Sequence, residues 1–99
     1  MVTKALLVRL EALPGKEAEL ADFLTGARSI VMDEPGTTAW FAIRFGPSTF
    51  GVYDVFPVDA ARDAHLAGGV GQALEPNTGV LFSEPQIEKI DVIADKLPG

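Results

Sequence analysis

Between positions 50 and 68 the sequence is FGVYDVFPVDAARDAHLAG, and its two halves differ in pattern. The first half is rich in aromatic and β-branched residues, which is typical of a β-strand. Pro57 ends this strand, because proline cannot donate to a sheet ladder. The second half predicts an alanine-rich helix with Asp59 as its N-cap, and the glycines after Ala67 end it. The stretch therefore predicts a strand that leads directly into a short helix.

A second predicted strand, residues 38–45, precedes this one (residues 49–56) across the loop Gly46-Pro47-Ser48. The loop length sets Phe45 opposite Thr49 and therefore Trp40 opposite Asp54, and opposed residues share a face of the sheet. One face then carries Trp40, Ala42, Arg44, Phe50, Val52, Asp54 and Phe56. The other face is almost wholly apolar, with Ala39, Phe41, Ile43, Phe45, Gly51, Tyr53 and Val55. A sheet with two apolar faces must be covered on both sides.

The rest of the chain supplies two more strands and a long helix. Apolar residues spaced three and four apart predict an amphipathic helix from residue 16 to 31, which Pro35-Gly36 ends. Strands are predicted at 2–11 and 87–94, with one helical turn at 70–75 and a strand fragment at 80–82. This order predicts a single α+β domain over residues 1–99, a ferredoxin-like βαββαβ fold with a four-stranded antiparallel sheet and both helices on one face.

Composition favours a second copy of the chain as the partner. A chain of 99 residues buries only a modest fraction of its surface, yet 47% of this one is hydrophobic. The apolar face that carries Phe41 and Tyr53 has no helix to cover it. We therefore expect a homodimer through the sheet faces, which closes a dimeric α+β barrel.

The charge and the residue inventory exclude several classes of function. A net charge of −6 disfavours nucleic acid and anionic membranes as partners. One histidine and no cysteine argue against a metal site and exclude a thiol nucleophile. No signal peptide or membrane-length apolar run is visible, so we expect a cytoplasmic protein.

Three features of the sequence resemble a known family. They are the order of elements, the segments Pro14-Gly15-Lys16-Glu17 and Glu34-Pro35-Gly36-Thr37 around the first helix, and the stretch that ends in Ala64-His65-Leu66. Together they resemble the antibiotic biosynthesis monooxygenase domain of the dimeric α+β-barrel superfamily. The resemblance implies a homodimer with a cavity between sheet and helices in each subunit.

The same resemblance implies an activity. Some members of the family oxygenate aromatic phenols or quinols without metal or flavin, because the substrate itself gives an electron to dioxygen. Haem-degrading relatives in the superfamily use an Asn, a Trp and a His. Here His65 falls near the expected Trp position and Asn77 is far from the first strand, so we expect no haem and no other cofactor.

His65 is the first candidate site residue. An imidazole with an ordinary pKa near 6.5 suits a general base for a phenolic substrate. The helical spacing predicts that it faces the sheet together with Ala61, Ala64 and Gly68. The alternative is a partly buried packing residue that hydrogen-bonds a neighbouring carboxylate or carbonyl.

The polar sheet face supplies the other candidates. Asp54 is expected to orient His65 or to accept a proton. Trp40 and Phe50 are expected to contact the faces of an aromatic ligand, and Arg44 is expected to bind an anion. Taken singly, each has a simpler explanation: Trp40 fills core, while Arg44 and Asp54 reach solvent at the strand ends.

Two functions remain open from the sequence. The first is a cofactor-independent monooxygenase that acts on a small aromatic phenol or quinol. The second is a non-catalytic small-molecule-binding or interaction protein on the same dimeric barrel, which the small number of acid and base groups favours.

Overall fold

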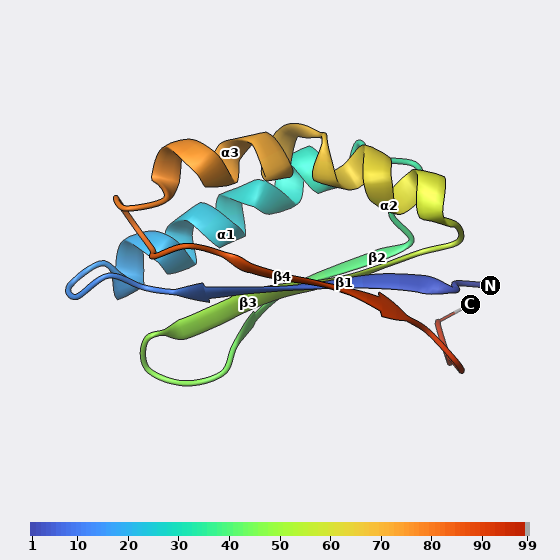
Figure 1. Ribbon diagram of the computed structural model, residues 1–99, viewed down its shortest axis with the longest axis horizontal. Coiled ribbons are helices and arrows are strands. Elements are labelled where there is room, and N and C mark those ends of the chain that lie inside the picture. Colours follow the sequence, from blue (N-terminus) through green and yellow to red (C-terminus); the bar gives the residue numbers. More distant parts are fainter. Residues whose placement is uncertain (99) are drawn as a thin grey trace.

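The computed structural model describes residues 1–98, so Gly99, the last residue of the predicted domain, lies outside the described residues. One sheet forms a layer, and all three helices lie on the same side of it (Figure 1). The elements are β1 (Lys4–Glu11), α1 (Glu17–Val31), β2 (Ala39–Arg44), β3 (Thr49–Phe56), α2 (Asp59–Leu66), α3 (Gly69–Asn77) and β4 (Gln86–Asp91).

The sheet has four strands in the order β2-β3-β1-β4, and every neighbouring pair is antiparallel. This confirms the predicted α+β ferredoxin-like fold. The predicted hairpin register is also confirmed: Trp40 pairs with Asp54, Phe41 with Tyr53 and Arg44 with Phe50. β1 continues the face on which Asp54 lies, because Leu6 pairs with Asp54.

Local interactions explain where α1 begins and ends. Gly15 adopts a φ of +81° in the turn before it, a conformation that glycine takes without a steric penalty. Two acidic residues in the first turn and Arg28 in the last complement the helix dipole. The buried residues Leu20, Leu24, Ala27 and Val31 form the stripe that faces the sheet.

The helices predicted after β3 need two corrections. Asp59 is not the N-cap of α2: Val58 holds that position without a side-chain cap, and the Asp59 carboxylate pairs with Arg62 inside the first turn. Residues 70–75 form more than a single turn, because a separate helix, α3, runs from Gly69 to Asn77. Pro76 lies in the last turn of α3, where its missing amide hydrogen leaves one carbonyl of the preceding turn without its helical donor.

The remaining strand predictions hold with shorter bounds. β1 begins at Lys4 and β4 spans Gln86–Asp91, while the predicted fragment at 80–82 makes only isolated bridges from Phe82 to Ala12 and Thr78. No helix among residues 1–98 is long and apolar enough to cross a membrane.

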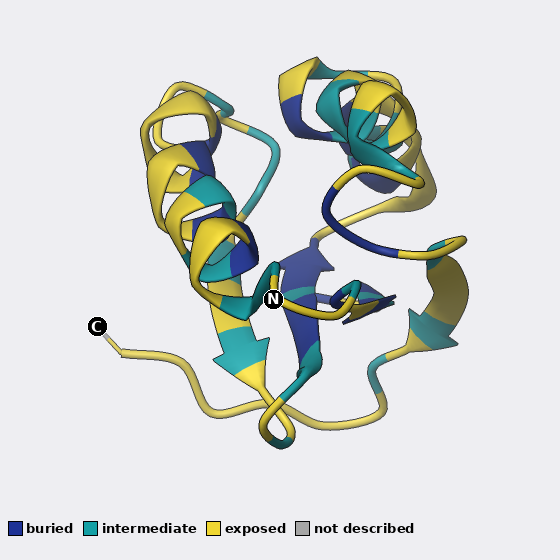
Figure 2. Cartoon of the chain, turned by 90° about the vertical axis from the view of Figure 1, so that its left-hand side faces the viewer, coloured by how far each residue is buried: buried dark blue, intermediate teal, exposed yellow. Residues whose placement is uncertain are grey.

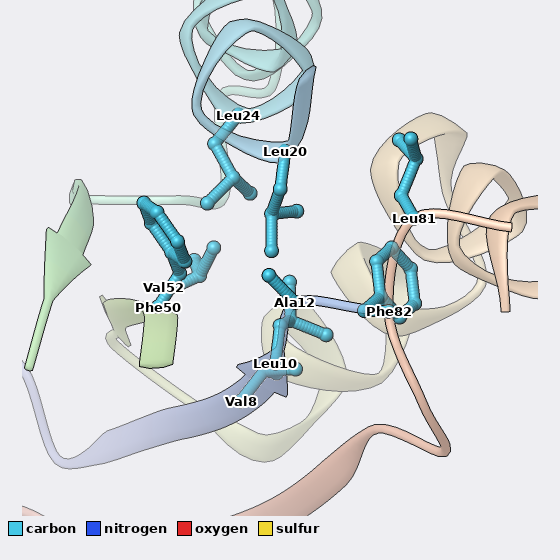
Figure 3. Close-up of a cluster of buried hydrophobic side chains, with 9 residues drawn as sticks. All are labelled: Val8, Leu10, Ala12, Leu20, Leu24, Phe50, Val52, Leu81 and Phe82. Carbon is cyan, nitrogen blue, oxygen red and sulfur yellow. The ribbon is translucent and has the colours of Figure 1, made fainter. Parts of the chain in front are cut away.

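The main core lies between α1 and the two central strands (Figure 3). Leu20 and Leu24 of α1 point toward Leu10 of β1 and Phe50 of β3, and Phe82 closes the cluster from the segment after α3. All of these side chains are at most 4% exposed. Burial of this kind supplies roughly 25 cal/mol per Å² of apolar surface.

The face of the sheet that points away from the helices is only partly covered. Val2, Ala5 and Val55 are buried there against Val92, which follows β4. Phe41 is still 54% exposed and Phe45 47%. Figure 2 shows the buried residues concentrated on the central strands and on the helix sides that face them. The predicted two-sided apolar sheet is therefore present, with one side open.

Candidate functional site

Helix α2 turns two polar residues, Arg62 and His65, toward the sheet. The prediction placed Ala61 and Ala64 on this side with His65, but Ala64 is exposed and Ala61 only half-buried. The reason lies in Arg62, whose Nη1 donates to the carbonyl oxygens of Ala5 (3.2 Å) and Ile90 (3.1 Å). These bonds anchor α2 over β1 and β4, which sets the rotation of the helix and the position of His65.

His65 lies between two carboxylates. Its Nε2 is 2.7 Å from Oδ2 of Asp54 on β3, and its Nδ1 is 2.5 Å from Oε1 of Glu34 in the turn after α1. Thr37 donates its hydroxyl to the same Glu34 oxygen at 2.9 Å. The ring of Phe56 packs against the imidazole at a centroid distance of 5.3 Å. Three separate elements thus hold one imidazole in a fixed orientation.

Asp54, His65 and Glu34 form a triad, and burial perturbs the pKa values of the first two. Asp54 is 1% exposed, and its burial raises the pKa of its carboxyl despite the nearby imidazole. Burial by itself lowers the pKa of His65, but the contacts with Asp54 and Glu34 outweigh it, and the pKa of His65 is raised. The two carboxylates therefore make the imidazole a stronger base than burial alone would leave it.

An inner chamber lies on the Asp54 side of this triad. Asp54 and His65 line it among apolar side chains that include Leu6, Leu24 and Leu74, and its volume is about 20 Å³. A space of this size holds roughly one water molecule. Neither Asp54 oxygen makes a well-aligned hydrogen bond with any described residue, and Trp40 Nε1, opposite on β2, has no acceptor among them. Of these two residues only Asp54 lines the chamber.

Two open grooves lie on the other side, at Glu34. The first, which we call the Glu34 groove, holds about 380 Å³ between His65, Ala61 and the turn at Pro35 and Gly36. The second, the Trp40 groove, holds about 490 Å³ between α1 and β2, and Glu34 and Thr37 line both. His65 therefore separates a closed apolar interior from grooves open to solvent.

The five predicted site residues do not converge on one point. His65 and Asp54 are in contact, and Trp40 lies beside Asp54 on the neighbouring strand. Arg44 lies at the β2–β3 hairpin instead, where it donates to the carbonyl oxygens of Gly46 (3.0 Å) and Pro47 (2.7 Å).

The side chain of Arg44 also stacks on Phe50, with its guanidinium carbon 4.8 Å from the ring centre. Together with Ala42 and Thr25, the two side chains line a separate hairpin groove of about 220 Å³. The structure thus places Arg44 and Phe50 away from the imidazole.

Glu34 is the member of the site that the sequence prediction missed. In the sequence it marks only the end of α1, within Glu34-Pro35-Gly36-Thr37. Its partner His65 is 31 positions away along the chain, and no local pattern links the two. Within the described part of the chain, no group of three or more His, Cys, Asp and Glu side chains is arranged to hold a metal ion.

Comparison with solved structures includes a match of high identity. The NE2512 protein of unknown function from Nitrosomonas europaea is 55% identical to this chain, with a TM-score of 0.97, and the match covers 100% of this chain and 97% of that one. No protein-family model matches the chain, and no curated protein matches it.

Other solved structures share the fold at low identity. A candidate antibiotic biosynthesis monooxygenase from Caulobacter crescentus is 22% identical over 94% of this chain and 92% of its own, with a TM-score of 0.76. Another, from Deinococcus radiodurans, is 20% identical over 97% of this chain and 99% of its own, with a TM-score of 0.79. These matches bear out the resemblance at the level of the fold.

Proposed function

Because the chain belongs to the same family as the NE2512 protein of Nitrosomonas europaea, whose function is unknown, we propose a function from the geometry of its own site. The protein binds a small aromatic phenol or quinol beside His65 and oxygenates it with dioxygen, with the substrate as the source of electrons. The single observation that carries this proposal is the buried imidazole of His65 between the carboxylates of Asp54 and Glu34. The shared fold with candidate antibiotic biosynthesis monooxygenases supports the reaction type.

The reaction needs no external reductant. A phenol and dioxygen give a quinone and water: one oxygen atom replaces a ring hydrogen, and the other leaves as water with that hydrogen and the hydroxyl proton. All the electrons that dioxygen takes up come from the phenol. The protein has to remove the hydroxyl proton, because the phenolate gives up an electron far more readily than the neutral phenol does.

The buried triad supplies this proton transfer. Asp54 Oδ1 lacks a hydrogen-bond donor and so is free to accept one from a ligand hydroxyl. The proton passes to the Asp54–His65 pair, and Glu34 stabilises the imidazolium from the other side. The same pair returns the proton to the departing oxygen. Trp40 lines the Trp40 groove and not the chamber, so its indole has no part in this proton transfer.

Oxygen uptake with a panel of quinols, including 1,4-dihydroxynaphthalene, tests the proposal. We expect uptake above the uncatalysed rate, and a loss of about 10²-fold or more in His65→Gln and Asp54→Asn, as for removal of a general base. Asp63→Asn is the matched control, because this exposed carboxylate on α2 touches only Lys89, at 4.0 Å. Unchanged uptake in His65→Gln contradicts its role as the base.

The second function, non-catalytic binding of a small molecule, is favoured by one observation. A chamber of about 20 Å³ is too small for an aromatic ring unless the surrounding side chains move. Under this alternative the triad only fixes α2 on the sheet. Quinol binding that persists in His65→Gln, without oxygen uptake in the native protein, favours the alternative.

We also propose that the open sheet face pairs with a second copy of the chain. Half-exposed Phe41 and Phe45 on this face support the proposal, because a contiguous exposed apolar patch marks an interaction surface. Sedimentation of the native protein is expected to give twice the chain mass, and Phe41→Asp to give the monomer. Met32→Asp, at a residue 66% exposed on the helix side, is the control. A monomeric native protein contradicts the pairing.

A further inference from the structure

The inner chamber has three boundaries with outer grooves, each formed by side chains that line both spaces. His65 borders the Glu34 groove, and Leu24 borders the hairpin groove. Gly71 and Leu74 border a third groove of about 440 Å³, here called the α3 groove, which lies between α3 and the segment that leads into β4. A ligand that reaches Asp54 has to cross one of these boundaries.

Two of the three boundaries are fixed. His65 is held on both ring nitrogens by carboxylates, at 2.5 and 2.7 Å. Leu24 is 2% exposed within the main core, so its displacement would break the best-packed part of the molecule. Neither side chain can swing aside without disrupting the contacts that hold the fold together.

The third boundary is the one that can open. Leu74 is half-buried at the edge of the main core, on the short helix α3, which packs mainly against α1 and α2. Gly71 adds no side chain, because a Cβ there would lie 2.0 Å from the carbonyl oxygen of Leu66. Leu74 is thus the one side chain that separates the α3 groove from the chamber. A change in its rotamer, or a small shift of α3, joins the two spaces.

The α3 groove also has a charge preference. Glu75 and Glu84 line it, together with Thr78, Pro85 and Ile87, and no basic side chain does. Asp54 lies at the inner end of the route. Carboxylates along such a route repel an anion and leave an uncharged ligand unaffected.

We propose that Leu74 is the gate through which ligands enter the Asp54–His65 chamber, and that Glu75 and Glu84 restrict entry to uncharged phenols. This inference rests on the proposed function for the identity of the ligand. The gate itself does not depend on that identity, and a measurement without ligand tests it.

Hydrogen exchange of the His65 imidazole tests the gate in the ligand-free protein. The chain has one histidine, which lines the chamber with its Nε2 2.7 Å from Asp54, so a single NMR signal reports water entry. We expect Leu74→Ala to speed this exchange about tenfold more than Leu66→Ala does. Leu66 is the matched control, because it lines the chamber without bordering the α3 groove. Equal exchange in the two variants overturns the gate.

Ligand binding tests the charge preference. Nitroaromatic rings quench tryptophan emission, so Trp40 reports the binding of 3-nitrophenol, which is mostly uncharged at neutral pH, and of its anionic analogue 3-nitrobenzoate. We expect only 3-nitrophenol to bind the native protein, with association faster in Leu74→Ala and slower in Leu74→Phe. The double variant Glu75→Gln/Glu84→Gln is expected to gain about tenfold in affinity for 3-nitrobenzoate.

The outcomes separate the gate from the proposed function. Binding of 3-nitrophenol at one rate in all Leu74 variants overturns the gate and leaves the proposed function standing. Equal affinity of the native protein for both ligands overturns the charge selection. Fast imidazole exchange in Leu74→Ala without binding of any phenol upholds the gate and contradicts the proposed function.

Discussion

The space between sheet and helices is filled in two different ways along its length. Under α1, Leu20 and Leu24 pack on Leu10 and Phe50 without a polar atom among their side chains (Figure 3). Under α2, the inward-facing side chains are Arg62 and His65. The same sheet thus carries an apolar core at one end and a buried ionic cluster at the other.

This difference suggests that stability alone does not account for the ionic end. A buried ion pair loses hydration that its mutual attraction repays only in part, so apolar residues of similar volume are often as stabilising or more so. An apolar contact would hold α2 on the sheet at least as well as His65 and Asp54 do. Stability therefore does not account for their presence, whereas the proton transfer proposed above would.

The largest expected effect comes from the apolar end. Leu20 is fully buried, and Leu20→Ala removes its packing and leaves a cavity, at a cost of about 4 kcal/mol in the free energy of unfolding. Urea unfolding followed by circular dichroism measures this loss. The NMR titration of His65 in the still-folded variant is expected to match the native protein. A shifted His65 titration would show that the two ends are coupled.

At the ionic end the single and double variants are expected to differ. His65→Leu leaves the Asp54 carboxylate buried without a partner and costs about 3 kcal/mol at neutral pH. Asp54→Leu/His65→Leu removes both charges, and its stability in urea is expected to return close to that of the native protein. A double variant as unstable as the single one would show that the pair itself stabilises the fold.

The pH dependence of stability follows from the raised pKa of His65. The folded protein binds the imidazole proton more tightly than the unfolded chain, whose histidine pKa is about 6.5. The stabilising contribution is therefore complete below that pH and is lost as the pH rises through the folded pKa. Urea midpoints across this range are expected to fall in the native protein and stay level in Asp54→Leu/His65→Leu.

The smallest effect is expected at the hairpin. Arg44→Gln removes hydrogen bonds to two exposed loop carbonyls, at a cost of about 0.5–1 kcal/mol. Binding of 3-nitrophenol and oxygen uptake are expected to stay at native levels, because Arg44 lines the hairpin groove and not the chamber. A large loss of 3-nitrophenol binding in this variant would instead support the original prediction that Arg44 is an anion-binding residue of the site.

The fold was largely predictable because its signals are local. The period-two pattern and the short loop after Phe45 were enough to set Trp40 opposite Asp54, since register follows from loop length. The three-and-four spacing predicted the inward face of α1. Helix α3 was underestimated, because Gly71 and Pro76 are poor helix formers and only packing against α1 and α2 extends it.

The site was predictable only in part. His65 and Asp54 were found because a lone histidine and a charged residue on a sheet face stand out in a sequence. The spacing predicted that Ala61 and Ala64 face the sheet. The hydrogen bonds of Arg62 to two strand carbonyls turn the side of α2 that carries Arg62 and His65 toward the sheet instead. Such contacts join distant parts of the chain and leave no periodic trace.

The sequence by itself determined the order of elements along the chain, the hairpin register and the presence of one apolar sheet face without a helix, because these follow from patterns within a few residues. Only the tertiary structure decided that Glu34 becomes the second partner of His65, that Arg44 and Phe50 lie apart from it, and that the inner chamber is nearly closed. These features depend on how α2 and α3 pack over the sheet. That packing is the sum of many weak contacts across the chain, and no single segment encodes it.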